Sequence, residues 1–218
     1  MKKRIVLVED HPIVRQGFTQ LINQESDLVV VGEAWDIGTA LEEIDLKKPD
    51  IALIDLSLKD ASGLELIKTL KTIDPELPML VVSLHNERIY AERALRAGAK
   101  GFIMKAEATE NIMEAIRIVL NGGIYLSGSM RELLLQKVTG NTKQGLATLE
   151  LLSDREFEIF QLIGDGYKTK AIAEKLNLSI KTVETYKAHL KQKLKLNDAT
   201  ELIQYAVEWN MKNVKKVY

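Results

Sequence analysis

Five short apolar runs alternate with five amphipathic segments between Lys3 and Gly122, and no other feature constrains the fold of this chain as strongly. A short apolar run bounded by turn residues predicts a buried strand, and apolar residues three and four positions apart predict a helix. Regular alternation of the two is typical of a parallel sheet with helices on both faces. The expected strands are Ile5–Val8, Leu28–Val31, Ile51–Ile54, Met79–Val82 and Gly101–Met104. The expected helices lie near Ile13–Asn23, Ile37–Leu46, Leu64–Ile73, Arg88–Ala97 and Asn111–Leu120.

The strand order follows from general rules on how strands connect. Right-handed crossovers leave few arrangements for an alternating chain of about 120 residues. We expect the α/β flavodoxin-like (βα)5 order, 2-1-3-4-5, which places the ends of the first and third strands side by side at the switch point. In open α/β sheets the carboxyl ends of the strands carry the chemistry.

The alternation stops after residue 122, and the remaining chain has a different pattern. Residues 123–148 contain a possible short helix, Met130–Val138, and a polar, breaker-rich stretch, Thr139–Gly145, so we interpret them as a linker. From Leu149 onward the sequence predicts four short helices, the first of which opens with a capping box, Ser153–Glu156. The expected domains are therefore an α/β domain at 1–122 and an all-α four-helix domain at 149–218.

Composition and charge narrow the classes of function. The chain has no Cys, which excludes disulfides, thiolate catalysis and Cys-ligated zinc. No window approaches the roughly 20 apolar residues that a membrane span needs, so we expect a cytoplasmic protein that does not contact the membrane. The net charge is -1, but residues 167–195 hold eight Lys and only two Glu. Such a local excess can bind phosphates.

Three carboxylates are expected to converge at the carboxyl edge of the sheet. Glu9 and Asp10 follow the first strand, and Asp55 follows the third. Close carboxylates repel one another unless a cation lies between them, and oxygen ligands favour Mg²⁺. The alternative is that Glu9 and Asp10 cap the helix after Pro12 and that Asp55 begins a turn.

The next two strand ends carry groups suited to phosphoryl transfer. Ser83 follows the fourth strand and Lys105 follows the fifth. A carboxylate can attack phosphorus to form an acyl phosphate, while a cation and an ammonium neutralise the transferred oxygens. Each residue alone is more often a turn serine or a solvated lysine, but together they favour a phosphoacceptor site at Asp55.

A second site is indicated by Thr169–Val183, which has the helix, tight turn and Ser179-capped second helix of a helix-turn-helix. Such a motif places its second helix in the major groove of double-stranded DNA, where flanking polar side chains hold phosphates. The alternative is a basic, solvated helix in a small bundle. The candidate contact residues are Lys170, Lys181, Thr182, Glu184, Thr185, Lys187, Ala188 and Lys191.

The first set of residues resembles the receiver domain of bacterial two-component response regulators at each signature position: Glu9-Asp10, Asp55, Gly63, Ser83, Phe102 and Lys105. The resemblance implies that a sensor histidine kinase phosphorylates Asp55 and that the backbone carbonyl of Ser57 completes the Mg²⁺ site. It also implies that Ser83 and Phe102 form a switch pair. Two departures from the family pattern are Lys59, where Pro is usual, and Ala106, which replaces a common Pro.

The C-terminal segment resembles the LuxR-type DNA-binding domain, so the whole chain is similar to the NarL/FixJ class of response regulators. The resemblance implies a homodimer when the protein is phosphorylated or bound to DNA, formed by the last helix through Leu202, Ile203 and Ala206. These residues could equally belong to the core. Glu184 and Tyr186 depart from the usual Lys and His, so no operator sequence is inferred. The motifs that carry the resemblance are Leu152–Glu156, Gly166, Ile172-Ala173, Leu176, Thr182-Val183 and Lys193-Leu194.

We therefore expect a transcriptional regulator switched by phosphorylation, not an enzyme. The alternative within DNA-binding proteins is an orphan regulator that acts without phosphorylation. Two enzyme classes that use α/β folds fit less well. A phosphatase of the haloacid dehalogenase type needs a second Asp where Ser57 stands, and a nucleotide-binding reductase needs a Gly-rich loop where the chain has Glu9–Pro12.

Overall fold

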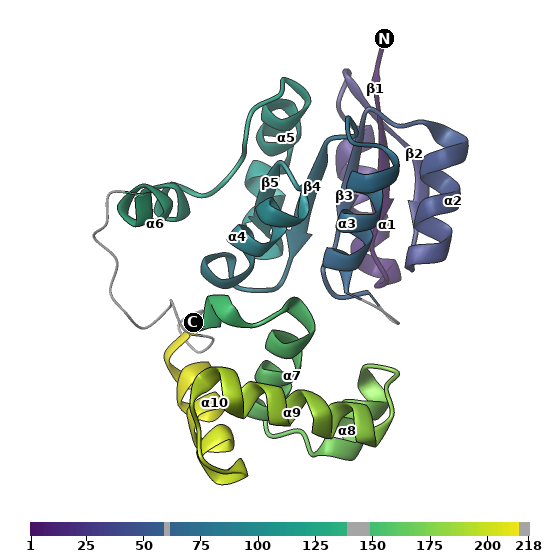
Figure 1. Ribbon diagram of the computed structural model, residues 1–218. Helices are drawn as coiled ribbons and strands as arrows, with labels where there is room; N and C mark the ends of the chain where they lie inside the picture. Colours follow the sequence, from purple (N-terminus) through teal and green to yellow (C-terminus); the bar gives the residue numbers. More distant parts are fainter. Residues whose placement is uncertain (59–61, 139–148, 214–218) are drawn as a thin grey trace. The chain divides into compact units, whose positions relative to one another are not determined.

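The computed structural model describes residues 1–58, 62–138 and 149–213, and the chain divides into two compact units, Met1–Leu135 and Gln136–Tyr218. The first unit is a sheet covered by helices and the second is built from helices (Figure 1). Within the described residues, no helix is both long enough and apolar enough to cross a membrane.

The first unit contains a parallel five-stranded sheet of order β2-β1-β3-β4-β5, which confirms the predicted topology. The middle strand β3 is buried along its whole length because both faces are covered. Its Leu53 pairs with Leu7 on one side and with Leu80 on the other. The strands are β1 (Lys3–Val8), β2 (Leu28–Ala34), β3 (Ile51–Ile54), β4 (Met79–Ser83) and β5 (Gly101–Met104).

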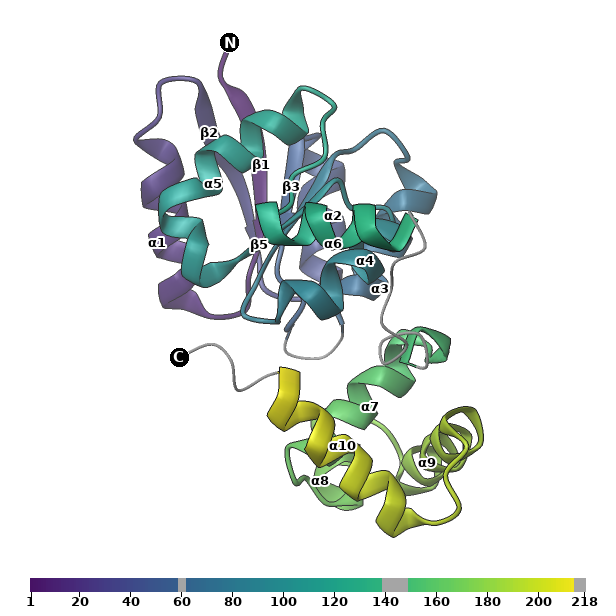
Figure 2. The same ribbon diagram turned by 90° about the vertical axis from the view of Figure 1, so that its left-hand side faces the viewer.

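Helices lie on both faces of this sheet (Figures 1 and 2). Apolar residues of α1 and α5, among them Ile22 and Ile112, pack with Leu53 and Leu80 in one core cluster. On the opposite face α3 contacts both α2 and α4. The five helices are α1 (Pro12–Asn23), α2 (Ile37–Lys47), α3 (Gly63–Ile73), α4 (Glu87–Ala97) and α5 (Lys105–Leu120).

The helix after β5 begins earlier than the sequence predicted. We expected it near Asn111, but α5 starts at Lys105. The first turns read as polar, and their apolar contact with the core comes through Ala108, which is fully buried. The good helix formers at 105–108 extend the helix to the end of the strand.

The chain after α5 returns to the edge of the sheet. The backbone N–H of Tyr125 donates to the carbonyl of Lys100 at 3.0 Å, and the N–H of Phe102 donates to the carbonyl of Tyr125 at 2.9 Å. A helix, α6 (Gly128–Val138), follows. Residues 123–135, which the sequence assigned to the linker, thus belong to the first unit. The breaker-rich stretch Thr139–Gly145 lies outside the described residues.

The second unit packs its helices around an aromatic core. The rings of Phe157 and Trp209 meet edge to face, with their centroids 5.5 Å apart. The predicted capping box at Ser153 and the predicted cap at Ser179 are both present. Asp198 caps the last helix, since its Oδ1 accepts from two backbone N–H groups. The elements are η1 (Leu149–Leu151), α7 (Asp154–Gly164), α8 (Thr169–Lys175), α9 (Ile180–Leu194) and α10 (Ala199–Asn213).

Candidate functional site

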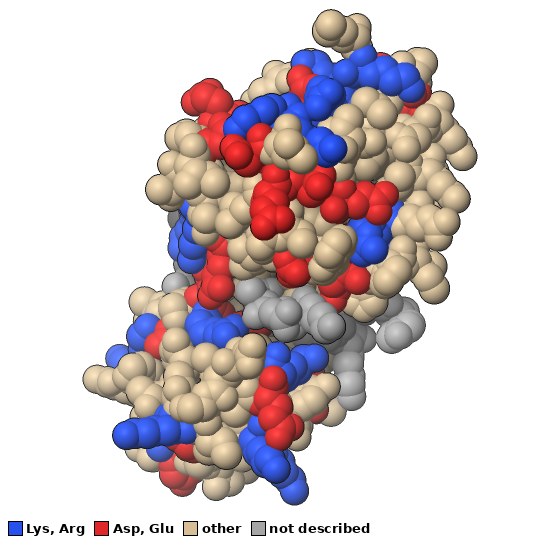
Figure 3. Space-filling model, turned by 90° about the vertical axis from the view of Figure 1, so that its right-hand side faces the viewer, with Lys and Arg blue, Asp and Glu red and all other residues tan. Residues whose placement is uncertain are grey.

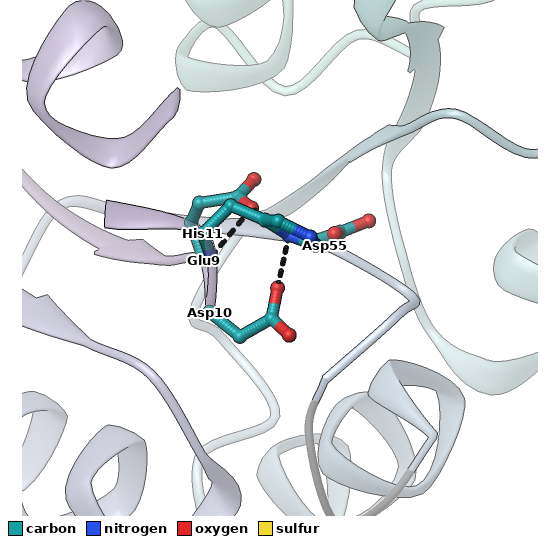
Figure 4. A group of neighbouring side chains, drawn as sticks. All are labelled: Glu9, Asp10, His11 and Asp55. Carbon is teal, nitrogen blue, oxygen red and sulfur yellow. Dashed lines mark hydrogen bonds and ion pairs between the residues drawn. The ribbon is translucent and has the colours of Figure 1, made fainter. Parts of the chain in front are cut away.

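The carboxyl edge of the sheet gathers acidic residues into one pocket. Glu9 follows β1 and Asp55 follows β3, and the backbone N–H of Asp55 donates to the carbonyl of Val8, which holds the two strand ends together. Glu9 and Asp55 are buried, with 1% and 2% of their surface exposed. Ligand atoms of Glu9, Asp10, His11 and Asp55 all lie within 4.8 Å of one another (Figure 4). The structure thus brings together the three carboxylates expected at this edge.

Lys105, the first residue of α5, places a positive charge in the pocket. Its Nζ lies 2.5 Å from Glu9 Oε2 and 2.8 Å from Asp55 Oδ2. Burial lowers the pKa of Lys105, but the carboxylates of Asp55 and Glu9 outweigh burial and raise the pKa above its ordinary value. The ammonium therefore remains charged and balances part of the negative charge.

The second carboxylate oxygen of Asp55 is in a different position. Asp55 Oδ1 is buried and has no hydrogen-bond partner within the described part of the chain. A buried acceptor without a partner is costly unless a ligand uses it. Two further carboxylates, from Glu9 and Asp10, lie beside it. The residues present therefore fit a hard divalent cation such as Mg²⁺.

His11 lies at the same pocket and was not predicted as a site residue. Its Nδ1 is 2.6 Å from Asp10 Oδ1 and 3.3 Å from Glu9 Oε1, while its side chain is 60% exposed (Figure 4). Its backbone N–H also donates to Glu9 Oε1 at 3.1 Å. The signal that could have found it is its position directly after the acidic pair.

The expected switch residues lie on the two strands beyond β3. Ser83 and Phe102 are both fully buried, so the aromatic ring is inside the unit. Ser83 Oγ accepts from the backbone N–H of His85 at 3.2 Å. The His85 imidazole Nε2 is 2.9 Å from Ser57 Oγ, a contact across 28 residues that the sequence pattern did not predict. Lys59, the departure noted beside this pocket, lies outside the described residues.

The predicted DNA-contacting residues lie on α8 and α9. Ser179 begins α9 by accepting from the backbone N–H of Thr182 at 3.0 Å. Buried Val183 and Leu190 attach the other side of the helix to the core. All of the predicted residues are exposed or partly exposed: Lys170, Lys181, Thr182, Glu184, Thr185, Lys187, Ala188 and Lys191.

Two of these residues are bound to each other. Glu184 Oε1 accepts from Thr169 Oγ1 at 2.8 Å and from Lys187 Nζ at 3.0 Å, and Lys187 Nζ also donates to Thr169 Oγ1 at 3.1 Å. The hydrogen bond from Thr169, followed by that from Lys187, lowers the pKa of Glu184. This network joins the start of α8 to the middle of α9, and no local sequence pattern predicts it. The visible face of this unit accordingly carries acidic and basic side chains side by side (Figure 3).

The three residues expected at a dimer interface do not share one environment. Leu202 and Ala206 are fully buried in the core of the second unit, which is the alternative that the sequence left open. Ile203 is 48% exposed. Of the three side chains, only that of Ile203 is available at the surface of α10.

Family models match both parts of the chain. Residues 5–117 match the response regulator receiver domain, and residues 150–206 match the bacterial regulatory proteins of the luxR family. The oxygen regulatory protein NreC of Staphylococcus carnosus (strain TM300) is 36% identical over 211 residues, covering 94% of this chain and 97% of the relative. NreC of Staphylococcus aureus (strain JH9) is 38% identical over the same shares.

A solved structure extends the similarity to both units. RcsB from Salmonella enterica serovar Typhimurium, bound to promoter rprA in the presence of phosphomimetic BeF3-, aligns with a TM-score of 0.67 at 26% identity, covering 95% of this chain and 99% of that one. The chain therefore belongs to the response regulators of two-component systems. Within that family it is a DNA-binding transcription regulator of the NarL/FixJ class, with a receiver domain and a LuxR-type helix-turn-helix domain, and not an enzyme.

Proposed function

We propose that Asp55 is the phosphoacceptor of this regulator and that a sensor histidine kinase supplies the phosphoryl group. The observation that carries the proposal is the unequal environment of the two Asp55 oxygens. Oδ2 is held by the Lys105 ammonium, whereas Oδ1 is buried and without a partner among the described residues. A fixed carboxylate with one unpartnered oxygen is suited to attack phosphorus.

The transfer exchanges one bond for another. Asp55 Oδ1 forms a bond to the phosphorus of a phosphohistidine, and the bond from phosphorus to the imidazole nitrogen breaks. The departing imidazole keeps the electron pair and takes up a proton. Glu9, Asp10, Asp55 and the carbonyl of Ser57 would hold Mg²⁺, which would supply positive charge beside the transferred oxygens.

Three further side chains have roles around the acyl phosphate. Lys105 donates to a phosphoryl oxygen, which offsets part of the added charge. Ser83 gives up its bond from the His85 N–H and turns its hydroxyl toward another phosphoryl oxygen. The Phe102 ring then moves into the space that the Ser83 hydroxyl leaves, and in this proposal the two residues form the switch.

The second unit supplies the output. We propose that α9 enters the major groove, with Lys170, Lys181, Lys187 and Lys191 binding phosphates and with Thr182, Thr185 and Ala188 facing base edges. The RcsB structure named above contains promoter DNA, which supports a similar role here. Glu184 can accept from cytosine N4 only by giving up its bonds from Thr169 and Lys187.

Phosphorylation favours a homodimer in this proposal, and the exposed side of α10 is its interface. Ile203 and Met211 are 48% and 56% exposed and lie eight residues apart, with partly buried Val207 between them. Residues at this spacing share one face of a helix. Ile203 therefore remains in the proposed interface, while Leu202 and Ala206 support it from the core.

The test uses acetyl phosphate and Mg²⁺ with the full chain. We expect one phosphoryl group per chain, lost in Asp55→Asn, together with tighter binding of a promoter duplex by the labelled protein. Glu110→Gln is the control, because Glu110 is an exposed carboxylate on α5 and should label normally. Labelling without any change in DNA affinity would leave the orphan regulator as the better account. Labelling that persists in Asp55→Asn would exclude Asp55 as the acceptor.

A further inference from the structure

Glu87, the first residue of α4, is a buried carboxylate that the phosphorylation chemistry does not use. Only 5% of its surface is exposed. It accepts a hydrogen bond from the backbone N–H of Ser127 at 2.8 Å and a second, short one from the Ser127 hydroxyl. Glu87 stands four residues after Ser83 in the chain. The carboxylate thus ties the helix that follows the pocket to a residue 40 positions further on.

Ser127 in turn controls the start of α6. Its Oγ accepts from the backbone N–H of Met130 at 3.1 Å, so the hydroxyl donates to Glu87 and caps α6 at once. Met130 is fully buried and Leu126 is 5% exposed, which anchors both sides of Ser127. The beginning of α6 is therefore fixed by α4.

A second attachment lies two residues earlier. The carbonyl of Tyr125 accepts from the backbone N–H of Phe102, the expected aromatic switch residue on β5. The segment Tyr125–Ser127 is consequently bound at one end to the strand that carries Phe102 and at the other to the helix that follows Ser83. Ser83 and Phe102, the proposed switch pair, are therefore both connected to the segment before α6. Phe102 is connected through its backbone hydrogen bond to Tyr125, and Ser83 through the start of α4.

Burial makes this contact sensitive to change. Desolvation raises the pKa of Glu87, although both bonds from Ser127 oppose the shift. Removing a partner from a buried, hydrogen-bonded carboxylate leaves an unpaired buried group, which costs free energy. A partly formed contact is therefore unfavourable. A contact of this kind suits an element with two discrete arrangements.

We propose that Glu87 is a positioning residue that couples the Asp55 pocket to α6: movement of α4 after phosphorylation shifts Ser127, and with it the helix that leads into the DNA-binding unit. The inference rests on the proposed function, since it presumes that Asp55 phosphorylation changes DNA binding. It adds the route by which the pocket reaches α6.

The experiment compares Glu87→Gln, Ser127→Ala and the double variant with the parent full-length chain. Glu87→Gln keeps the Ser127 cap of α6, whereas Ser127→Ala keeps the carboxylate. Ser127→Thr retains a hydroxyl donor, and Glu110→Gln removes an exposed charge elsewhere. Each chain is labelled with acetyl phosphate and Mg²⁺, and the ratio of DNA affinities with and without the label is measured. Hydrogen exchange of the Ser127 and Met130 amides is followed in both states.

We expect all chains to label at the parental rate, because Glu87 and Ser127 lie outside the pocket. Coupling between two sites is typically about 5- to 150-fold, and loss of a hydrogen bond to a charged group is enough to reduce it about tenfold. The affinity ratio should therefore fall about tenfold, or to one where the parental ratio is smaller, in both single variants. The double variant should fall no further, and Ser127→Thr and Glu110→Gln should keep the parental ratio.

Amide exchange distinguishes failure of the Glu87 coupling from failure of the proposed phosphorylation switch. In the parent chain phosphorylation should change the exchange rate of the Ser127 amide, and in Glu87→Gln that response should be lost. If phosphorylation does not change the DNA affinity of the parent chain, the proposed function is contradicted. An affinity ratio or a Ser127 response that is the same in Glu87→Gln as in the parent overturns the inference.

Discussion

Replacing Gly63 by Ala should destabilise the first unit because the backbone leaves no room for a side chain. A Cβ built at Gly63 would lie 2.1 Å from the carbonyl oxygen of Asp55, 2.8 Å from Leu56 Cα and 3.0 Å from the Asp55 carbonyl carbon. All three atoms belong to the backbone that continues β3, so no flexible side chain can move aside. The Gly63 N–H also donates to the carbonyl of Leu56 at 2.9 Å, which holds the two segments close.

These distances give the order of magnitude of the free-energy cost of Gly63→Ala. Overpacking a well-packed site costs about 1–3 kcal/mol, and three backbone contacts at or below 3.0 Å place Gly63→Ala at the upper end, near 3 kcal/mol. Gly17→Ala is the matched control. Gly17 lies inside α1, and a Cβ there meets nothing within 4 Å. Ala is favoured over Gly inside a helix by about 0.5–1 kcal/mol, so this variant should be more stable than the parent.

Native-state hydrogen exchange of the β3 and α3 amides is the assay, because it reports the free energy of opening of the first unit alone. The protected amides of Gly63→Ala should lose about 3 kcal/mol and those of Gly17→Ala should gain up to about 1 kcal/mol. Phosphorylation of Gly63→Ala should also slow, since the clash displaces Asp55. Opening free energies for Gly63→Ala within about 0.5 kcal/mol of the parent would refute the steric reasoning.

Three further predictions concern charge. Lys105→Met leaves the carboxylates of Glu9 and Asp55 without their ammonium and should reduce the free energy of unfolding by about 3–5 kcal/mol. Mg²⁺ should restore part of this loss, and thermal unfolding that is unaffected by Mg²⁺ contradicts the metal site. Burial raises the pKa of Glu87 from 4.5, so its contribution to stability is present below that pH and is lost as the pH rises through the folded-state pKa. Burial also opposes ionisation of Glu156, but Lys193 and Ser153 outweigh it and lower the pKa, so its contribution is present above pH 4.5 and is lost as the pH falls through the folded-state pKa. Urea unfolding between about pH 2 and 7 should therefore show Glu87→Gln gaining stability relative to the parent as the pH rises above 4.5 and Glu156→Gln losing it as the pH rises toward 4.5, and parallel curves contradict this. Lys181→Gln should reduce the salt dependence of DNA binding by about one phosphate contact, and Glu184→Gln should tighten binding at low salt because Lys187 is released. Fluorescence anisotropy of a labelled promoter duplex measures both effects. An unchanged salt slope for Lys181→Gln removes that residue from the contact set.

The central strands could be predicted because their burial is complete. Ile51–Ile54 is covered on both faces, so every residue is apolar and the run is easy to recognise. The edge strand β2 is different: its central residues are only partly buried, and Gly32 and Glu33 interrupt the apolar pattern. Its last residues were therefore missed. The site residues at the strand ends could be placed because parallel strands bring their carboxyl ends to one edge.

The contacts that the sequence did not reveal join segments far apart in the chain. Glu87 meets Ser127 across 40 residues, and His85 meets Ser57 across 28. No periodicity encodes such pairs, because they depend on where two loops end in space. Glu184 is a related case at shorter range: its charge was noted, but its bond from Thr169 depends on how α8 packs against α9. In each case local pattern predicted the element and tertiary packing decided the partner.

The proposed coupling between the Asp55 pocket and α6 begins at residues that balance the charge of the pocket. The carboxylates of Glu9, Asp10 and Asp55 carry three negative charges, the Lys105 ammonium returns one positive charge, and one divalent cation completes neutrality. Converting the Asp55 carboxylate to an acyl phosphate adds about one further negative charge, since a phosphoryl group carries about -1.5 to -2 at neutral pH. The donors that can compensate are Lys105, at the start of α5, and Ser83, at the end of β4. Three residues join Ser83 to Glu87, so in the proposed coupling a movement of Ser83 reaches the start of α4 and, through Glu87, Ser127.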